Sequence, residues 1–390
     1  MVTRSHAIFF ASALAICGFG IGAVAEDGVS RDKIIFGQVA ALDGPAQALG
    51  KGMREGILAA FDEANRAGGI SGRKLELRSV DDGYEPERTI EATKKILAED
   101  KVFALVGAVG TPTSKAAQPI ATDAKVPFVG PFTGAEFLRN PYNRYIVNVR
   151  ASYFQETEAW IDHLTKDLGI SRIAILYQDD AFGLAGLDGV KRALAKRNML
   201  LVAEGSFKRN TTAVKSALLD IIKAQPQAVV TVGPYKPVAE FIKLARHAKL
   251  DAVFVAISFV GSDALAQELG DKGAGVIVSQ VVPFPWDASI PVVASFQAAL
   301  TAANGKPGFV SLEGYLVGRL VVEALKRVSG EPTRESFLDV IAKSGSFDLG
   351  GVKLSYGPNN NQGMGDVFFT ILQADGSFMS VTRLVKMAGQ

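Results

Sequence analysis

Small hydroxyl residues gather at the start of one predicted helix, where they could bind an anion. They follow a predicted strand at 102–106, and with their neighbours they are Gly110, Thr111, Pro112, Thr113 and Ser114. Free backbone N–H groups, the positive end of the helix dipole and side-chain hydroxyls together suit a carboxylate. An ordinary helix N-cap needs only one of these hydroxyls, so this motif alone leaves both interpretations open.

A second loop of similar composition favours anion binding. The next strand ends in Pro131, Phe132, Thr133 and Gly134. Because the carboxyl ends of parallel strands meet at one edge of a sheet, we expect the two loops to lie side by side.

Aromatic residues follow strands in a later part of the chain. They are Phe182, Tyr235 and Phe259. Each could belong to a hydrophobic core, but positions at the carboxyl ends of strands usually face a cleft. We therefore expect them to face the two hydroxyl loops.

Residues that commonly carry catalysis are few and isolated. The sequence has three histidines, of which His6 lies in the N-terminal leader, and His163 and His247 lie in helical patterns. We interpret the latter two as surface or half-buried helix residues. Metal-ligand spacings, a Gly-x-Ser-x-Gly elbow and a Gly-x-x-x-x-Gly-Lys phosphate loop are absent from the sequence. We predict no catalytic residue, no metal and no cofactor.

Two pairs of aspartates follow predicted strands, at 81–82 and 179–180. Paired carboxylates can form an acid–base site, but more often they cap the next helix or hold a strand-end loop, which we favour. The segment 107–110, Gly-Ala-Val-Gly, resembles a dinucleotide-binding loop, but it lacks the third glycine and the acidic residue expected further on. A dehydrogenase is therefore disfavoured.

Alternating strands and helices must position these residues. Strands are predicted at 33–39, 74–80, 102–106 and 145–149, with helices at 47–67, 86–98 and 112–123. The pattern then restarts, with strands at 172–177, 200–207, 228–232, 252–257 and 275–278 and helices at 183–196, 212–224, 235–248 and 263–269. Helices at 292–303 and 312–328 precede β-rich stretches at 351–355, 367–373 and 378–384. This order predicts an α/β fold with two similar open parallel-sheet lobes and a binding site between them.

The bulk composition agrees with two domains. The chain has 390 residues, 48% of them hydrophobic and 21% charged, enough for two cores at roughly 100–200 residues per domain. The formal net charge is +2, from 42 basic and 40 acidic residues, so charge gives no reason to expect nucleic acid or an anionic membrane surface as partner.

The first 25 residues have the features of a signal peptide. Arg4 precedes an apolar run at 7–23, and Ala23-Val24-Ala25 suits cleavage after Ala25. A membrane anchor is less consistent, because serine and glycines interrupt the run. We expect a periplasmic mature chain without cysteine, since Cys17 lies in the leader. Disulfides and cysteine-ligated zinc are then excluded.

With these features the sequence resembles the type I periplasmic binding proteins of branched-chain amino acid ABC transporters. The resemblance covers nearly all of the mature chain. Its markers are Gly44-Pro45, the Asn-x-x-Gly-Gly-x-x-Gly element at 65–72, Asp81-Asp82 with Pro86, Gly107 and Gly110 with Gln118-Pro119, Asp-Asp-Ala-Phe-Gly at 179–183, and Gly233-Pro234-Tyr235.

The resemblance implies two lobes joined by three hinge segments, which close around a ligand. Lobe 1 would be 26–150 plus 283–365, and lobe 2 would be 151–282 plus 366–390. Thr111 or Thr113, near Gly110, and Thr133, beside Phe132, would hold a ligand carboxylate from lobe 1. Tyr153, Phe182 and Tyr235 would close from lobe 2.

One departure from the family pattern bears on the ligand. Ser258 stands where members that bind α-amino acids carry an acid, and the next carboxylate along the chain is Asp263. A buried ammonium without a partner is costly, so either another acid serves or the ligand lacks an α-amino group.

The resemblance implies a non-enzymatic substrate-binding component of an ABC importer. Such a protein captures an amino acid or a similar small carboxylate and delivers it to a permease, and we expect a monomer. The alternative is a sensory binding protein of the same fold that reports its ligand to a receptor.

Overall fold

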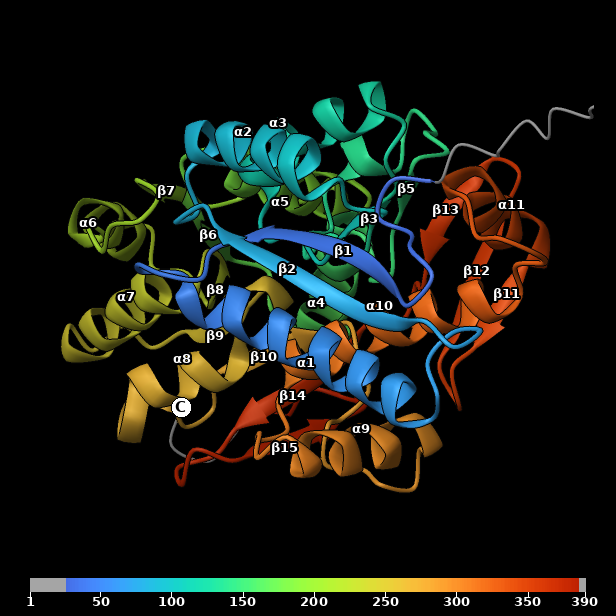
Figure 1. The fold of residues 1–390 in the computed structure, drawn as a ribbon. Helices are drawn as coiled ribbons and strands as arrows, with labels where there is room; N and C mark the ends of the chain where they lie inside the picture. Colours follow the sequence, from blue (N-terminus) through green and yellow to red (C-terminus); the bar gives the residue numbers. More distant parts are fainter. Residues whose placement is uncertain (1–25, 386–390) are drawn as a thin grey trace, which may run out of the picture.

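The structure is a computed structural model that describes residues 26–385. The predicted signal peptide and residues 386–390 lie outside the described residues. The fold has two α/β lobes, each built on its own open sheet (Figure 1). The predicted fold class is confirmed.

Lobe 1 contains a five-stranded parallel sheet with the strand order β2-β1-β3-β4-β5. Its strands are β1 (Lys33–Ala40), β2 (Lys74–Asp81), β3 (Ala104–Val106), β4 (Phe128–Val129) and β5 (Ile146–Val147). Its helices are α1 (Gln47–Arg66), α2 (Pro86–Lys95), α3 (Thr111–Asp123), α9 (Pro291–Ala302), α10 (Phe309–Lys326) and α11 (Arg334–Ser344). A small antiparallel sheet of β11 (Ser346–Asp348), β12 (Lys353–Gly357) and β13 (Asn360–Gly363) packs against α11.

Helices α1 and α10 lie in close contact although they are far apart in sequence. Glycines make this approach possible, since a Cβ atom at Gly56 would overlap the carbonyl oxygen of Ser311. All but three residues of α10 are buried, which matches its nearly continuous apolar sequence. This helix therefore forms much of the lobe 1 core.

Lobe 2 contains a seven-stranded sheet with the order β15-β14-β10-β9-β8-β6-β7. Its strands are β6 (Ile173–Gln178), β7 (Ala203–Phe207), β8 (Ala228–Val232), β9 (Val253–Ala256), β10 (Ile277–Gln280), β14 (Phe368–Leu372) and β15 (Phe378–Val381). Its helices are α4 (Tyr153–Lys166), α5 (Ala181–Ala195), α6 (Lys215–Lys223), α7 (Tyr235–His247) and α8 (Ser262–Leu269). The first five strands are parallel, and β14 and β15 add as an antiparallel pair beside β10.

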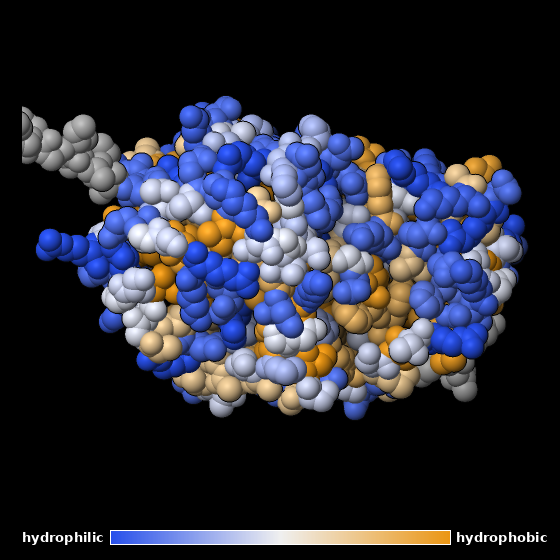
Figure 2. Space-filling view, turned by 90° about the vertical axis from the view of Figure 1, so that its right-hand side faces the viewer, coloured by the Kyte–Doolittle hydropathy of each residue, from blue (hydrophilic) through white to orange (hydrophobic). Residues whose placement is uncertain are grey.

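Three connections join the lobes, between β5 and α4, between β10 and α9, and between β13 and β14. The sheets agree with the predicted order of elements, while the exact boundaries at 150, 282 and 365 stay a prediction. Within 26–385 no helix is both long enough and apolar enough to cross a membrane. On the face shown in Figure 2, hydrophilic side chains predominate, and apolar residues show in patches among them.

Candidate functional site

The two predicted hydroxyl loops meet at the carboxyl edge of the lobe 1 sheet. Thr111 opens α3 and Thr133 follows β4, and their buried hydroxyl oxygens lie 2.7 Å apart. Thr113 is engaged elsewhere, because its hydroxyl donates to the backbone carbonyls of Val109 and Gly110. The structure thus brings Thr111 and Thr133 together and directs Thr113 toward its own helix.

Gly110 fits this edge because it has no side chain. It precedes α3 with φ +105°, a conformation that only glycine adopts readily, and a Cβ atom there would overlap the Tyr84 ring. Its N–H donates to the carbonyl of Phe132 at 3.3 Å, which ties the two loops together.

Tyr153 brings a third hydroxyl to this edge. Its backbone N–H, at the start of α4, donates to Gly134 in the second loop at 2.7 Å. Its hydroxyl is buried and has no hydrogen-bond partner among the described residues. Burial raises the pKa of Tyr153, and the charge of Arg150 opposes this shift. The three hydroxyls therefore converge on one buried spot.

A buried guanidinium lies beside these hydroxyls. Arg150 is 1% exposed, and its Cζ lies over the Phe132 ring, 4.5 Å from the ring centroid. Its Nη2 donates to Ser258 at 2.7 Å, and its Nε lies 3.1 Å from Oε1 of Glu313. Its Nη1 has no hydrogen-bond partner within residues 26–385. Burial disfavours the charge, but the carboxylates of Glu313 and Glu156 raise the pKa of Arg150, so the group stays cationic.

The acid beside Ser258 is Glu156, from α4. Its Oε1 accepts from the Ser258 hydroxyl at 2.8 Å, and its Oε2 accepts from the Ser258 N–H at 3.0 Å and from Ser279 at 2.7 Å. Burial raises the pKa of Glu156, and Arg150 and these hydrogen bonds oppose that shift. The Glu156 carboxylate therefore lies beside Ser258, the position at which an acid was expected from the family pattern.

Neither Arg150 nor Glu156 was predicted as a site residue. The signal for Glu156 is its helical spacing, because Tyr153, Glu156, Trp160 and Leu164 all lie on the buried face of α4. A glutamate at such a core position needs a partner. Asp263, the next carboxylate along the sequence from Ser258, instead accepts from the N–H that begins α10.

Aromatic rings form a wall between the lobes. Phe259 lies 5.2 Å from Phe132 and 4.5 Å from Phe182, measured between ring centroids, and Tyr153 lies 5.5 Å from Phe182. All four rings are fully or almost fully buried. Tyr235 is not one of these contacts, and its hydroxyl accepts from the Ala48 N–H in lobe 1 at 3.4 Å.

The aspartate pairs have the expected structural roles. Asp180 caps α5 by accepting from the Phe182 N–H at 2.9 Å, and Asp82 accepts from the N–H of Tyr84 and the hydroxyl of Thr89. The interpretation as capping and loop residues is confirmed. The histidine interpretation is confirmed as well, since His163 is half-buried against Asp167 at 2.6 Å and His247 is exposed at the end of α7.

Comparison with known proteins identifies the family. Residues 33–377 match the family model described as periplasmic binding protein. The crystal structure of a possible leucine/isoleucine/valine-binding protein from Rhodopirellula baltica SH 1 is 39% identical, with a TM-score of 0.86, over 92% of this chain and 98% of that one.

Relatives found by sequence comparison point to the same family. The leucine-, isoleucine-, valine-, threonine-, and alanine-binding protein of Pseudomonas aeruginosa is 24% identical over 85% of this chain and 86% of its own length. The Leu/Ile/Val-binding protein homolog 3 of Brucella melitensis is 27% identical, and that match spans 57% of this chain and 58% of the relative. The chain belongs to the type I periplasmic binding proteins of the branched-chain amino acid family.

Proposed function

We propose that this chain is the substrate-binding component of an ABC importer and captures an amino acid or a similar small carboxylate between its lobes. The observation that carries the proposal is the pair of buried, unpartnered donors, the Tyr153 hydroxyl and Nη1 of Arg150, beside the Thr111–Thr133 hydroxyl pair. Unpartnered polar groups are costly inside a protein, and a bound carboxylate would supply the partner that these two donors lack.

A ligand carboxylate suits this set of donors. Hydroxyls and a guanidinium can donate to its two oxygens, and hydrogen bonds to a charged acceptor are about twice as strong as neutral ones. The rings of Phe132, Phe182 and Phe259 would contact the rest of the ligand. This arrangement needs neither a nucleophile nor a metal, so the proposed role is binding without turnover.

Contacts that cross between the lobes support a closing movement. Nη2 of Arg209, in lobe 2, lies 2.8 Å from Oε2 of Glu85, in lobe 1. Nε2 of Gln178, in lobe 2, donates to the hydroxyl of Tyr84, in lobe 1, at 3.2 Å. Arg150 reaches Ser258 on the second lobe. We propose that a ligand shifts the population toward this closed form, which a permease then recognises. We further propose that the chain acts as a monomer in the periplasm, exported with a signal peptide cleaved after Ala25.

The position of Glu156 bears on whether the ligand carries an α-amino group. Glu156 already accepts three hydrogen bonds, and a carboxylate offers about four acceptor positions. One position would remain for an ammonium group. An α-amino acid and its deaminated counterpart are therefore the informative pair of ligands.

A thermal-shift screen tests the proposal. We would compare leucine with 4-methylpentanoate and phenylalanine with 3-phenylpropanoate. A ligand present at 100 times its dissociation constant stabilises the folded protein by about 2.7 kcal/mol. We expect at least one carboxylate from these pairs to raise the melting temperature. No shift with any amino acid, aliphatic acid or aromatic acid would count against the proposed function.

A further inference from the structure

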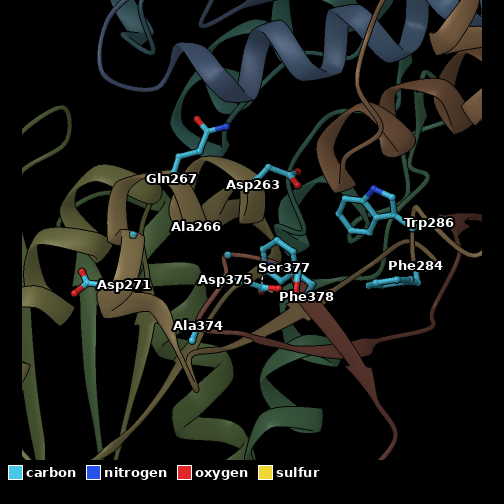
Figure 3. A pocket seen from close by; sticks show the side chains of 12 residues that line it. Asp263, Ala266, Gln267, Asp271, Phe284, Trp286, Ala374, Asp375, Ser377 and Phe378 are labelled. Carbon is cyan, nitrogen blue, oxygen red and sulfur yellow. Dashed lines mark hydrogen bonds between the residues drawn. The ribbon is translucent and has the colours of Figure 1, made fainter.

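A second pocket lies away from the hydroxyl loops, on the side where α8, the connection after β10 and the β14–β15 turn meet (Figure 3). It has a volume of about 740 Å³, within the usual range for small-molecule sites. The predicted carboxylate site does not extend to it, since none of the twelve residues that line it belongs to the hydroxyl loops or to the Arg150 cluster.

Aromatic rings form one side of this pocket. Trp286 and Phe284 come from the connection between the lobes, and Phe378 comes from β15. Trp286 is 42% exposed, stacks on Phe378 with an interplanar angle of 13° and contacts Phe284 at 5.0 Å. Phe309, at the start of α10, contacts both rings edge-on, with its ring centroid 5.5 Å from that of Trp286 and 5.3 Å from that of Phe378. Three neighbouring rings therefore pack against the exposed Trp286 ring.

The charged side chains of the lining are all acidic. Asp263, Asp271 and Asp375 line the pocket, and no lysine or arginine is among its lining residues in the described chain. Asp271 is paired with Lys272 at 3.0 Å. Neither Asp263 nor Asp375 forms an ion pair within residues 26–385. Asp263 accepts from the Phe309 N–H, and Asp375 accepts from the N–H and the hydroxyl of Ser377. In Figure 3 the Asp263 side chain extends toward the Trp286 side of the pocket.

We propose that this pocket binds a small organic cation, of the quaternary ammonium or methylated amine class, against Trp286 and the carboxylates of Asp263 and Asp375. Cations bind the negative face of aromatic rings, and tryptophan is the strongest partner. An anion would face two unneutralised carboxylates. A neutral apolar molecule would bury these negative charges without a counter-charge, which is costly.

Calorimetric titration of the mature chain with choline tests the proposal. The matched control ligand is 3,3-dimethylbutan-1-ol, which has the same shape without the charge. We expect choline to bind at least tenfold more tightly than this alcohol. The sequence contains two tryptophans, and Trp160 is fully buried, so a change in tryptophan fluorescence on choline binding would report contact at Trp286.

Variants locate the site. Trp286→Leu should weaken choline binding by about twofold to thirtyfold, the range expected for one cation–π contact. Trp286→Phe should weaken choline binding by a smaller factor, because it keeps an aromatic face. Asp375→Asn should weaken it as well, because it removes a charge from an exposed turn without changing the side-chain shape. Asp220→Asn, on the exposed face of α6, is the control and should leave the dissociation constant unchanged.

Circular dichroism and melting temperature verify that each variant is folded. Three results would each overturn the proposal: no choline binding, equal affinity for the uncharged alcohol, or unchanged choline affinity in both folded Trp286→Leu and Asp375→Asn.

Discussion

Replacing Tyr153 with phenylalanine separates a binding role of its hydroxyl from a structural one. The hydroxyl is buried and has no partner in the described part of the chain, while the ring packs against Phe182 at 5.5 Å. Tyr153→Phe keeps the ring and removes only the oxygen. If the hydroxyl serves the ligand, its removal should affect binding and spare the fold.

Tyr153→Phe should change stability and ligand affinity in opposite directions. A buried polar group without a partner costs about 1–3 kcal/mol, so ligand-free Tyr153→Phe should be at least as stable as the wild type. A hydrogen bond to a charged group contributes about 1.5–3 kcal/mol, which corresponds to about a tenfold to 150-fold weaker affinity for the carboxylate. Urea unfolding measures the first quantity and calorimetric titration the second.

Tyr356→Phe is the matched control. The Tyr356 hydroxyl is also buried, but it donates to the Asn148 carbonyl at 2.8 Å. Its removal should cost about 1–3 kcal/mol of stability and leave ligand affinity unchanged. A Tyr153→Phe variant that loses stability like Tyr356→Phe and binds ligand normally would refute the reasoning.

Three further predictions concern charge and backbone. If the ligand is an α-amino acid, Glu156→Gln should reduce the affinity for that amino acid at least tenfold more than it reduces the affinity for the deaminated counterpart. Calorimetry measures both affinities, and equal losses would remove Glu156 from ammonium binding. Burial raises the pKa of Asp263 to about 6 from its usual 3.8, so its stabilising contribution is complete below about pH 4 and is lost as the pH rises through 6. In urea unfolding, the wild type should therefore lose up to about 3 kcal/mol more than Asp263→Asn between pH 4 and pH 7, and parallel curves would contradict this. Gly110→Ala should destabilise by more than Gly44→Ala, because both have positive φ but only Gly110 lies against the Tyr84 ring; equal losses in urea unfolding would show that the ring gives way.

The two-lobed fold could be predicted because its signals are local. Alternating apolar strands and amphipathic helices recur along the chain, and glycines mark helix ends, as Gly68 and Gly69 do after α1. Strand β4 is only two residues long, too short for a periodic pattern. Helix α4 carries Glu156 and Thr157 on its buried face, which interrupts its apolar period.

The hydroxyl loops could be predicted from sequence and the charged cluster could not. Thr111 and Thr133 follow strands that are neighbours in one parallel sheet, so their proximity follows from topology. Arg150 and Glu156 meet at Ser258, which is more than 100 positions away in sequence, where the chain has passed through most of lobe 2. Such pairings depend on how the lobes pack, and the pattern within one segment carries no information about them.

Capture of a carboxylate by the hydroxyl pair is tested most directly by calorimetric titration of one ligand and its primary amide. The amide keeps the shape of the ligand and removes the negative charge. The wild type should bind the carboxylate at least tenfold more tightly than the amide, and Thr133→Ala should reduce this difference. Equal affinity for acid and amide, or the same preference in folded Thr133→Ala, would contradict the account.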